Sequence, residues 1–149
     1  MKILALIDGS KWSHKGALHA TAIGKKKGAD VVLFSVLDRR EARTMAFNYC
    51  TQSDQCEIIG TYEQNIWQDM QKNIQTELDS IQGFCSREGC RCTTKITEGD
   101  RRDEIVREIR EGGYGLVVMG AYGRSGKAQI GSCLGEICGD IDVPALIVR

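Results

Sequence analysis

The hydrophobic residues of this chain fall into short continuous runs that alternate with longer segments of helical period. The runs at 3–7 and 116–119 contain no polar residue, which is typical of strands covered on both faces. Residues 91–98 alternate between polar and apolar positions and are rich in Thr and Ile, a further strand pattern. Five strands are therefore predicted, near residues 2–8, 31–37, 91–97, 115–119 and 144–148.

Helical segments are predicted between these strands. Residues 10–27 open on a serine that can cap a helix and end before a glycine that can stop it. Apolar residues recur every three or four positions over 66–84, which predicts an amphipathic helix. Shorter helices are predicted over 103–112 and 132–140. Residues 39–62 show no clear period, so we expect an irregular insertion there, either a functional loop or a poorly ordered segment.

The alternation of strands and helices predicts the fold class. It favours an α/β protein with an open five-stranded parallel sheet and helices on both faces. The chain of 149 residues suits a single domain, 1–149, interrupted by the insertion at about 39–62. In such folds ligands bind beyond the carboxyl ends of the strands, where the strand order reverses. The loops at 8–10 and 120–132 lie at such ends and have unusual compositions.

Composition and charge exclude several classes of protein. With 42% hydrophobic residues and 20 basic against 20 acidic residues, the chain is too apolar and too balanced for a disordered protein. No apolar run approaches the roughly 20 residues of a membrane span, so no membrane partner is expected. A net charge of zero gives no general attraction for nucleic acid. Because the chain opens directly on a predicted strand without a signal peptide, we expect a cytoplasmic protein.

The chain contains seven cysteines, which raises the question of thiol or metal chemistry. Their odd number excludes complete pairing within one chain, and no Cys-x-x-Cys motif occurs. Buried or unreactive thiols are favoured over a metal or redox site, since free cysteine behaves as a small hydrophobic residue. A thiol or metal sensor remains an alternative, and it would use Cys50, Cys56, Cys85, Cys90 and Cys92.

The segment 120–132 has the composition of a phosphate-binding loop. Four glycines in it allow backbone N–H groups to approach an anion, and the predicted helix that follows has free N–H groups at its start. Arg124 and Lys127 can add positive charge. The loop is not a Walker A motif, because five residues separate Gly120 from Gly126 and alanine replaces the magnesium-binding hydroxyl. The first strand also lacks the dinucleotide-binding glycine pattern.

Several motifs together resemble the universal stress protein family. The glycine pattern at 120–132 and the closing strand at 143–149 resemble that family's nucleotide-binding members. The opening strand at 2–10, the turn at 98–100 and the fourth strand at 117–120 agree with the same family. The resemblance covers nearly the whole chain except about 39–62, and its motifs are specific only in combination.

The resemblance implies a Rossmann-like, adenine-nucleotide α-hydrolase-like fold, a homodimer formed through the last strand, and an adenine nucleotide as ligand. Ile7, Asp8 and Val36 would border adenine and ribose, and the nucleoside would lie over Met119 and Gly120. Phosphates would lie against the glycine loop and the helix start after it. The implied binding residues are Ile7, Asp8, Gly9, Ser10, Val36, Met119, Gly120, Gly123, Arg124, Gly131, Ser132 and Cys133.

One departure from the family pattern affects the ligand. Seven residues separate Gly123 from Gly131, where the family pattern has nine. We therefore expect the ligand to be ATP, or else AMP or ADP, with little preference for the longer phosphate chain. Asp8 would hold the ribose or Mg²⁺. His14 and His19 lie within the first predicted helix and are not expected to act as a base, so slow ATP hydrolysis is the most that is expected.

Three function classes therefore stay open. The first is an adenine-nucleotide-binding, stress-response regulatory dimer. The second is a nucleotide-free dimer that acts by binding other proteins. The third is the thiol or metal sensor.

Overall fold

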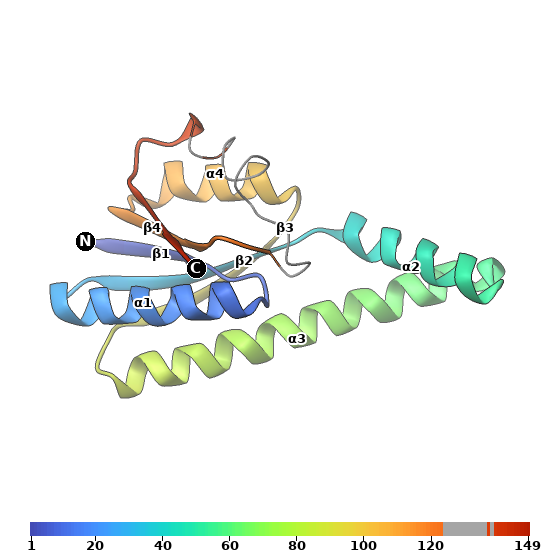
Figure 1. Ribbon diagram of the computed structural model, residues 1–149, viewed down its shortest axis with the longest axis horizontal. Helices are drawn as coiled ribbons and strands as arrows, with labels where there is room; N and C mark the ends of the chain where they lie inside the picture. Colours follow the sequence, from blue (N-terminus) through green and yellow to red (C-terminus); the bar gives the residue numbers. More distant parts are fainter. Residues whose placement is uncertain (124–136, 138) are drawn as a thin grey trace.

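The computed structural model describes residues 1–123, 137 and 139–149 (Figure 1). Its elements are β1 (Lys2–Leu6), α1 (Lys11–Lys27), β2 (Asp30–Leu37), α2 (Arg39–Ser53), a 3₁₀ turn (Cys56–Ile58), α3 (Ile59–Arg87), β3 (Cys92–Glu98), α4 (Arg101–Gly112), β4 (Leu116–Gly120) and β5 (Ala145–Val148). The five predicted strands are confirmed.

The strands form one sheet in the order β3-β2-β1-β4-β5. Every neighbouring pair is parallel, as the sequence predicted. β1 lies at the centre of the sheet, between β2 and β4. The chain first adds β2 and β3 on one side of β1, and it then adds β4 and β5 on the opposite side. The order therefore reverses beside β1, and β5 forms one edge of the sheet.

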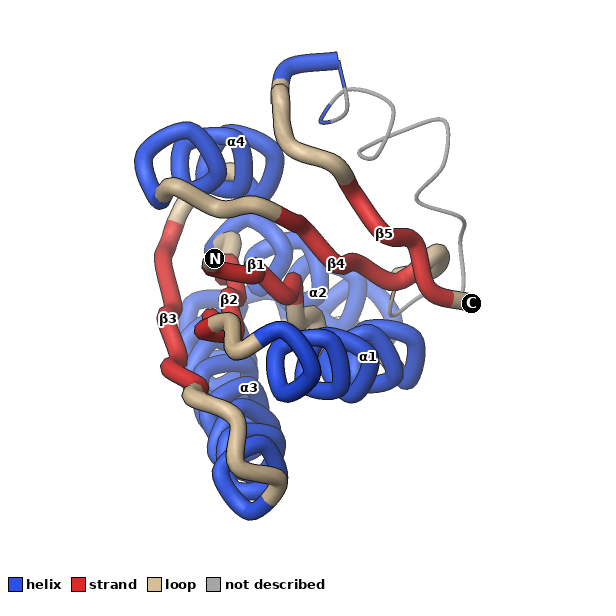
Figure 2. The backbone as a smooth tube through the Cα atoms, turned by 90° about the vertical axis from the view of Figure 1, so that its left-hand side faces the viewer, coloured by secondary structure: helices blue, strands red, loops and turns tan. Residues whose placement is uncertain are grey.

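Helices cover both faces of the sheet (Figure 2). Alternate residues of β1 point to opposite sides, with Ile3 and Ala5 in one core and Leu4 in the other. The first core includes Leu78 and Ile81 of α3 together with alanines of α1. The second core contains the apolar face of α4. Two buried faces explain why most strands are apolar throughout.

Caps fix the ends of the predicted helices. The Ser10 hydroxyl accepts from the N–H of Ser13 at 3.1 Å at the start of α1, and Asp100 similarly caps α4. α1 ends at Gly28, whose φ of 66° suits glycine. The helix predicted over 132–140 lies mostly outside the described residues, although Ile137, Gly139 and Asp140 are helical.

The prediction of an irregular segment at 39–62 is wrong. α2 occupies most of it, and α3 begins at Ile59 rather than near residue 66. The two helices form a hairpin that projects from the sheet, and we call residues 39–63 the arm (Figure 1). Ala42, Ala46 and Cys50 of α2 are fully buried in the arm. These residues recur every fourth position, which is a helical period. Because their side chains are small, the period does not stand out in the hydrophobic pattern of the sequence.

Candidate functional site

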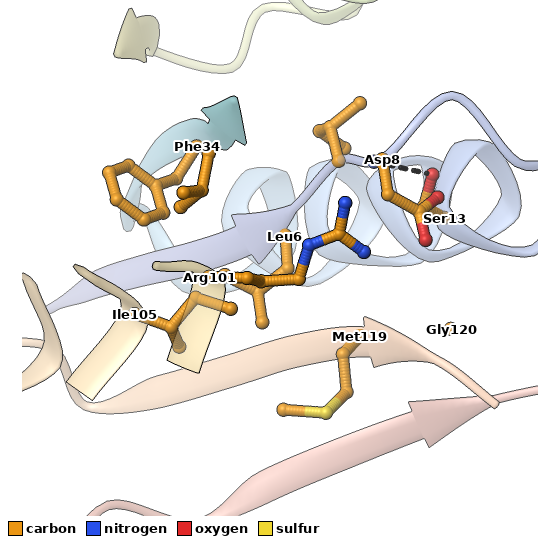
Figure 3. Close-up of a pocket in the computed structure, with 10 residues that line it drawn as sticks. Leu6, Asp8, Ser13, Phe34, Arg101, Ile105, Met119 and Gly120 are labelled. Atoms are coloured by element: carbon orange, nitrogen blue, oxygen red, sulfur yellow. Dashed lines mark hydrogen bonds between the residues drawn. The ribbon is translucent and has the colours of Figure 1, made fainter. Parts of the chain in front are cut away.

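A recess opens at the carboxyl ends of β1 and β4, where the strand order reverses (Figure 3). Ligands of open α/β sheets bind at this position. Its enclosed volume is about 30 Å³, roughly the space that one water molecule occupies in the liquid, so a larger ligand would also lie over the mouth of the recess. It is lined by Leu6, Ile7, Asp8, Ser13, Phe34, Val36, Arg101, Ile105, Met119 and Gly120.

The turn after β1 holds Asp8 at this recess. Asp8 Oδ1 accepts from the N–H of Ser10 at 2.9 Å, and the N–H of Asp8 donates to Ser13 Oγ at 3.2 Å. Gly9 between them has a φ of 85°, which L side chains rarely adopt. The turn is therefore fixed from both ends, and Asp8 brings a carboxylate to an otherwise largely apolar recess.

Gly120 is required by the packing of α1 against β4. A Cβ atom at this position would lie 2.9 Å from the backbone carbonyl carbon of Trp12 and 3.0 Å from the nitrogen of Ser13. Both are backbone atoms in the first turn of α1, so they cannot move aside cheaply. The absence of a side chain at Gly120 thus lets α1 begin directly beside the recess.

A buried hydroxyl near the recess has no partner among the described residues. Thr97 of β3 is the register partner of Val36, which lines the recess. Its Oγ1 atom is buried and makes no hydrogen bond. By contrast, the buried hydroxyl of Ser35 donates to the carbonyl of Ile7 at 2.7 Å. Buried polar atoms are normally paired, so this hydroxyl is an exception, but Thr97 does not itself line the recess.

Arg101 forms the charged wall of the recess. It lies at the start of α4 and donates to Glu41 of the arm at 3.3 Å. Nearby, Arg40 donates to Asp38 and to Asp100, at 2.6 Å each. The Arg40 guanidinium lowers the pKa of both carboxyl groups. Ion pairs therefore join the base of the arm to the helix that borders the recess.

The structure brings together some of the residues that the resemblance implied. Five of the twelve line the recess, and Gly9 and Ser10 belong to the adjoining turn. Gly123 follows β4 but does not line the recess. Four implied residues lie outside the described residues: Arg124, Gly131, Ser132 and Cys133.

Sequence reasoning missed several lining residues. The sequence pattern predicts helices around Ser13 and Ile105 and a buried strand around Phe34, without indicating a site at these residues. Arg101 follows the turn at 98–100 that carried part of the resemblance. Its position just after the carboxyl end of a parallel strand was the signal that could have identified it.

The cysteines form two separate groups. Cys50 and Cys56 are joined in a disulfide at the end of the arm, so the expectation of free thiols is wrong for this pair. Cys85 and Cys90 are buried free thiols. Burial raises the pKa of Cys90 to about 11 and also raises that of Cys92, so both are protonated near neutral pH. Within the described residues no cluster of three possible metal ligands occurs.

In the part of the chain that the structure describes, no helix is long and apolar enough to cross a membrane.

The strand order and the recess at the switch point define a Rossmann-like α/β protein. The profile of the universal stress protein family matches residues 58–149, more than half of the chain. The chain therefore belongs to the universal stress protein family. A comparison with curated protein sequences finds no match.

Solved structures share this fold. One is a hypothetical protein whose biochemical function was assigned from its structure, with a TM-score of 0.78, 21% identity, and coverage of 99% of this chain and 94% of that one. A universal stress protein from Archaeoglobus fulgidus in complex with dAMP has a TM-score of 0.66, 14% identity, and coverage of 100% and 98%. A universal stress protein in complex with cAMP has a TM-score of 0.68, 17% identity, and coverage of 100% and 96%.

Proposed function

We propose that this protein binds an adenine nucleotide in the recess and acts as a regulatory protein of the stress response. The observation that carries the proposal is the recess itself, an apolar hollow at the switch point with Asp8 at its wall. The complexes of two family members with dAMP and cAMP support adenine as the base. The cytoplasm is the expected compartment.

The lining residues suit different parts of a nucleotide. Phe34, Ile105 and Met119 offer an apolar surface for the base. The carboxylate of Asp8 can accept from ribose hydroxyls or hold Mg²⁺. The phosphates would extend toward Gly123 and the residues that follow it.

The glycine-rich loop provides the phosphate-binding half of the proposal. Its residues are Gly123, Arg124, Gly131, Ser132 and the amide of Cys133. Replacing Gly123 with Val places a branched side chain where backbone would meet phosphate, so this variant should lose binding and keep its fold. Because the loop is two residues shorter than the family pattern, ATP should bind less than tenfold more tightly than AMP, a difference below about 1.4 kcal/mol. Hydrolysis of ATP is expected to be slow at most.

Mass spectrometry of small molecules released from the purified protein tests the proposal. An adenine nucleotide in the released fraction, or micromolar binding of added AMP or ATP by calorimetry, is expected. Absence of both would favour the second candidate, a nucleotide-free dimer that acts through other proteins. Asp8→Asn is an informative variant, because it keeps the acceptor for Ser10 and removes only the charge. Asp79→Asn on the exposed side of α3 is its matched control.

A homodimer formed through β5 belongs to the same proposal. β5 lies at the edge of the sheet, and its Leu146 side chain is 36% exposed. Unpaired backbone groups at an edge favour pairing with a second copy, and a two-fold axis closes such a pair. Light scattering at tens of micromolar should report at least a dimer, whereas a monomer would contradict this assembly.

A further inference from the structure

The end of the arm concentrates exposed apolar side chains. We call residues 45–62 the tip. Of the eight large hydrophobic side chains that are exposed among the described residues, four lie on the tip. They are Met45, Phe47, Tyr49 and Ile58, with exposed fractions of 47, 57, 54 and 44%. Apolar side chains gathered in this way mark an interaction surface.

The packing inside the arm leaves these side chains about half exposed. Ala42, Ala46 and Cys50 already fill the contact between α2 and α3. Met45 and Tyr49, one helical turn apart, lie on one side of this contact. The ring of Tyr49 packs edge-to-face on Tyr62 at a centroid distance of 4.6 Å. With the disulfide closing the turn beside them, Met45 and Tyr49 form an apolar surface on one side of the tip, and Phe47 lies on the other side.

The last turns of α1 and α3 lie at the end of the molecule opposite the arm (Figure 1). A groove lies between these two helices. Leu18, Ala22 and Phe84 form its apolar part, and Leu18 is 37% exposed. The polar and charged residues that line the rest are Thr21, Lys25, Lys26 and Glu88. The volume of the groove is about 530 Å³, enough for several large side chains.

The charges of the two surfaces are opposite. The tip carries two charged residues, Asp54 and Glu57, and no basic one. The groove borders the three consecutive lysines that end α1. Of these, Lys25 pairs with Glu88 at 3.4 Å, while Lys26 has no carboxylate partner in the described part of the chain. Because Glu88 also lines the groove and pairs with Lys25, the charge that the acidic tip matches is that of Lys26.

We propose that the tip of one copy of this protein docks into the groove of a second copy. The tip and the groove lie at opposite ends of α3, whose 29 residues span about 43 Å. Two copies placed antiparallel about a two-fold axis bring each tip to the other's groove, so both contacts form together and the assembly closes. This contact is separate from the pairing of β5 edges.

The available surface is sufficient for such an assembly. A large side chain that is half exposed offers roughly 100 Å² of surface. The side chains on one side of a tip, the surface of the groove that they cover and the second copy of the contact together reach roughly 1,000 Å². A specific interface needs at least about this area.

Complementation between two variants tests the docking directly. Met45→Asp places a charge on the tip, and Leu18→Asp places one in the groove; both positions are exposed, so the fold should persist. Each variant alone should associate at least tenfold more weakly than the parent in sedimentation velocity. A mixture of the two, with one labelled, should associate more strongly than either alone, because the intact tip of one still fits the intact groove of the other. Thr76→Asp on the exposed middle of α3 is the control and should behave as the parent.

Charge exchange provides a second readout. Glu57→Lys and Lys26→Glu should each weaken association, and the double variant should recover part of it. Pairing through β5 leaves both surfaces unchanged, so it contributes equally to every sample. The proposal is overturned if the parent and both Asp variants associate equally, or if the mixture associates no more strongly than its components.

Discussion

The recess and the arm are built on different physical principles. The recess is assembled from residues far apart in the chain, brought together by parallel pairing of β1 with β2 and β4. The arm consists of neighbouring helices held by small side chains, a local turn and one disulfide. The comparison teaches that the position of the recess follows from the whole fold, whereas the arm can change without altering the sheet.

The largest effect should come from Gly120, where the recess depends on close packing. Gly120→Val should destabilise the protein by about 3 kcal/mol, because its side chain would overlap the backbone of α1. Urea unfolding measures the change. Gly16→Ala is the matched control, since its Cβ would lie 3.5 Å from Val118 Cγ1, an ordinary contact. Equal destabilisation by both variants would contradict this account of Gly120.

The disulfide should affect the arm and leave the recess unchanged. Reduction of Cys50–Cys56 by dithiothreitol yields two thiols and the oxidised reductant, and it opens a loop with a sequence separation of six. Closing so short a loop stabilises a folded segment by about 2 kcal/mol. Hydrogen exchange at tip amides should accelerate on reduction, whereas exchange at β1 and β4 should not. Equal acceleration in both regions would show that the arm and the sheet unfold together.

Arg101 should have a smaller effect, confined to ligand binding. Arg101→Ala should weaken AMP binding about threefold to tenfold, because the guanidinium lines the recess and only 33% of its side chain is exposed. Arg107→Ala removes a similar ion pair from α4 without reaching the recess, and AMP binding should be unchanged. Calorimetry measures the AMP affinity of both variants. An equal loss of affinity in both would show that the substitutions act by perturbing α4 and not through a contact of Arg101 with the ligand.

The smallest effect concerns pH at the base of the arm. Arg40 lowers the pKa values of Asp38 and Asp100 below their ordinary value of 3.8. Above pH 3.8 the two ionised carboxylates therefore stabilise the folded protein. This stabilisation is lost as the pH falls through the lowered pKa values that Asp38 and Asp100 have in the folded state. Trp67 packs under Arg39 at 5.2 Å and reports this region in a Trp12→Phe background. Its fluorescence should change below pH 4 in the parent and less in Arg40→Gln.

The sequence predicted the sheet well because continuous apolar runs are a strong signal for strands buried on both faces. It predicted Ile7, Asp8 and Met119 at the recess through the resemblance and the rule that ligands bind at carboxyl ends. It failed for the arm, since alanine and cysteine at a helical period resemble an unpatterned segment. It also missed Arg101, whose position depends on the start of α4.

The most direct test of the central claim is the amide spectrum of the ¹⁵N-labelled protein during titration with AMP. The account predicts saturable shifts at Asp8, Val36, Thr97 and Gly120, with the tip amides near Phe47 and Glu57 unchanged. Shifts confined to residues away from the recess, or no shifts at millimolar AMP, would contradict the proposed nucleotide site.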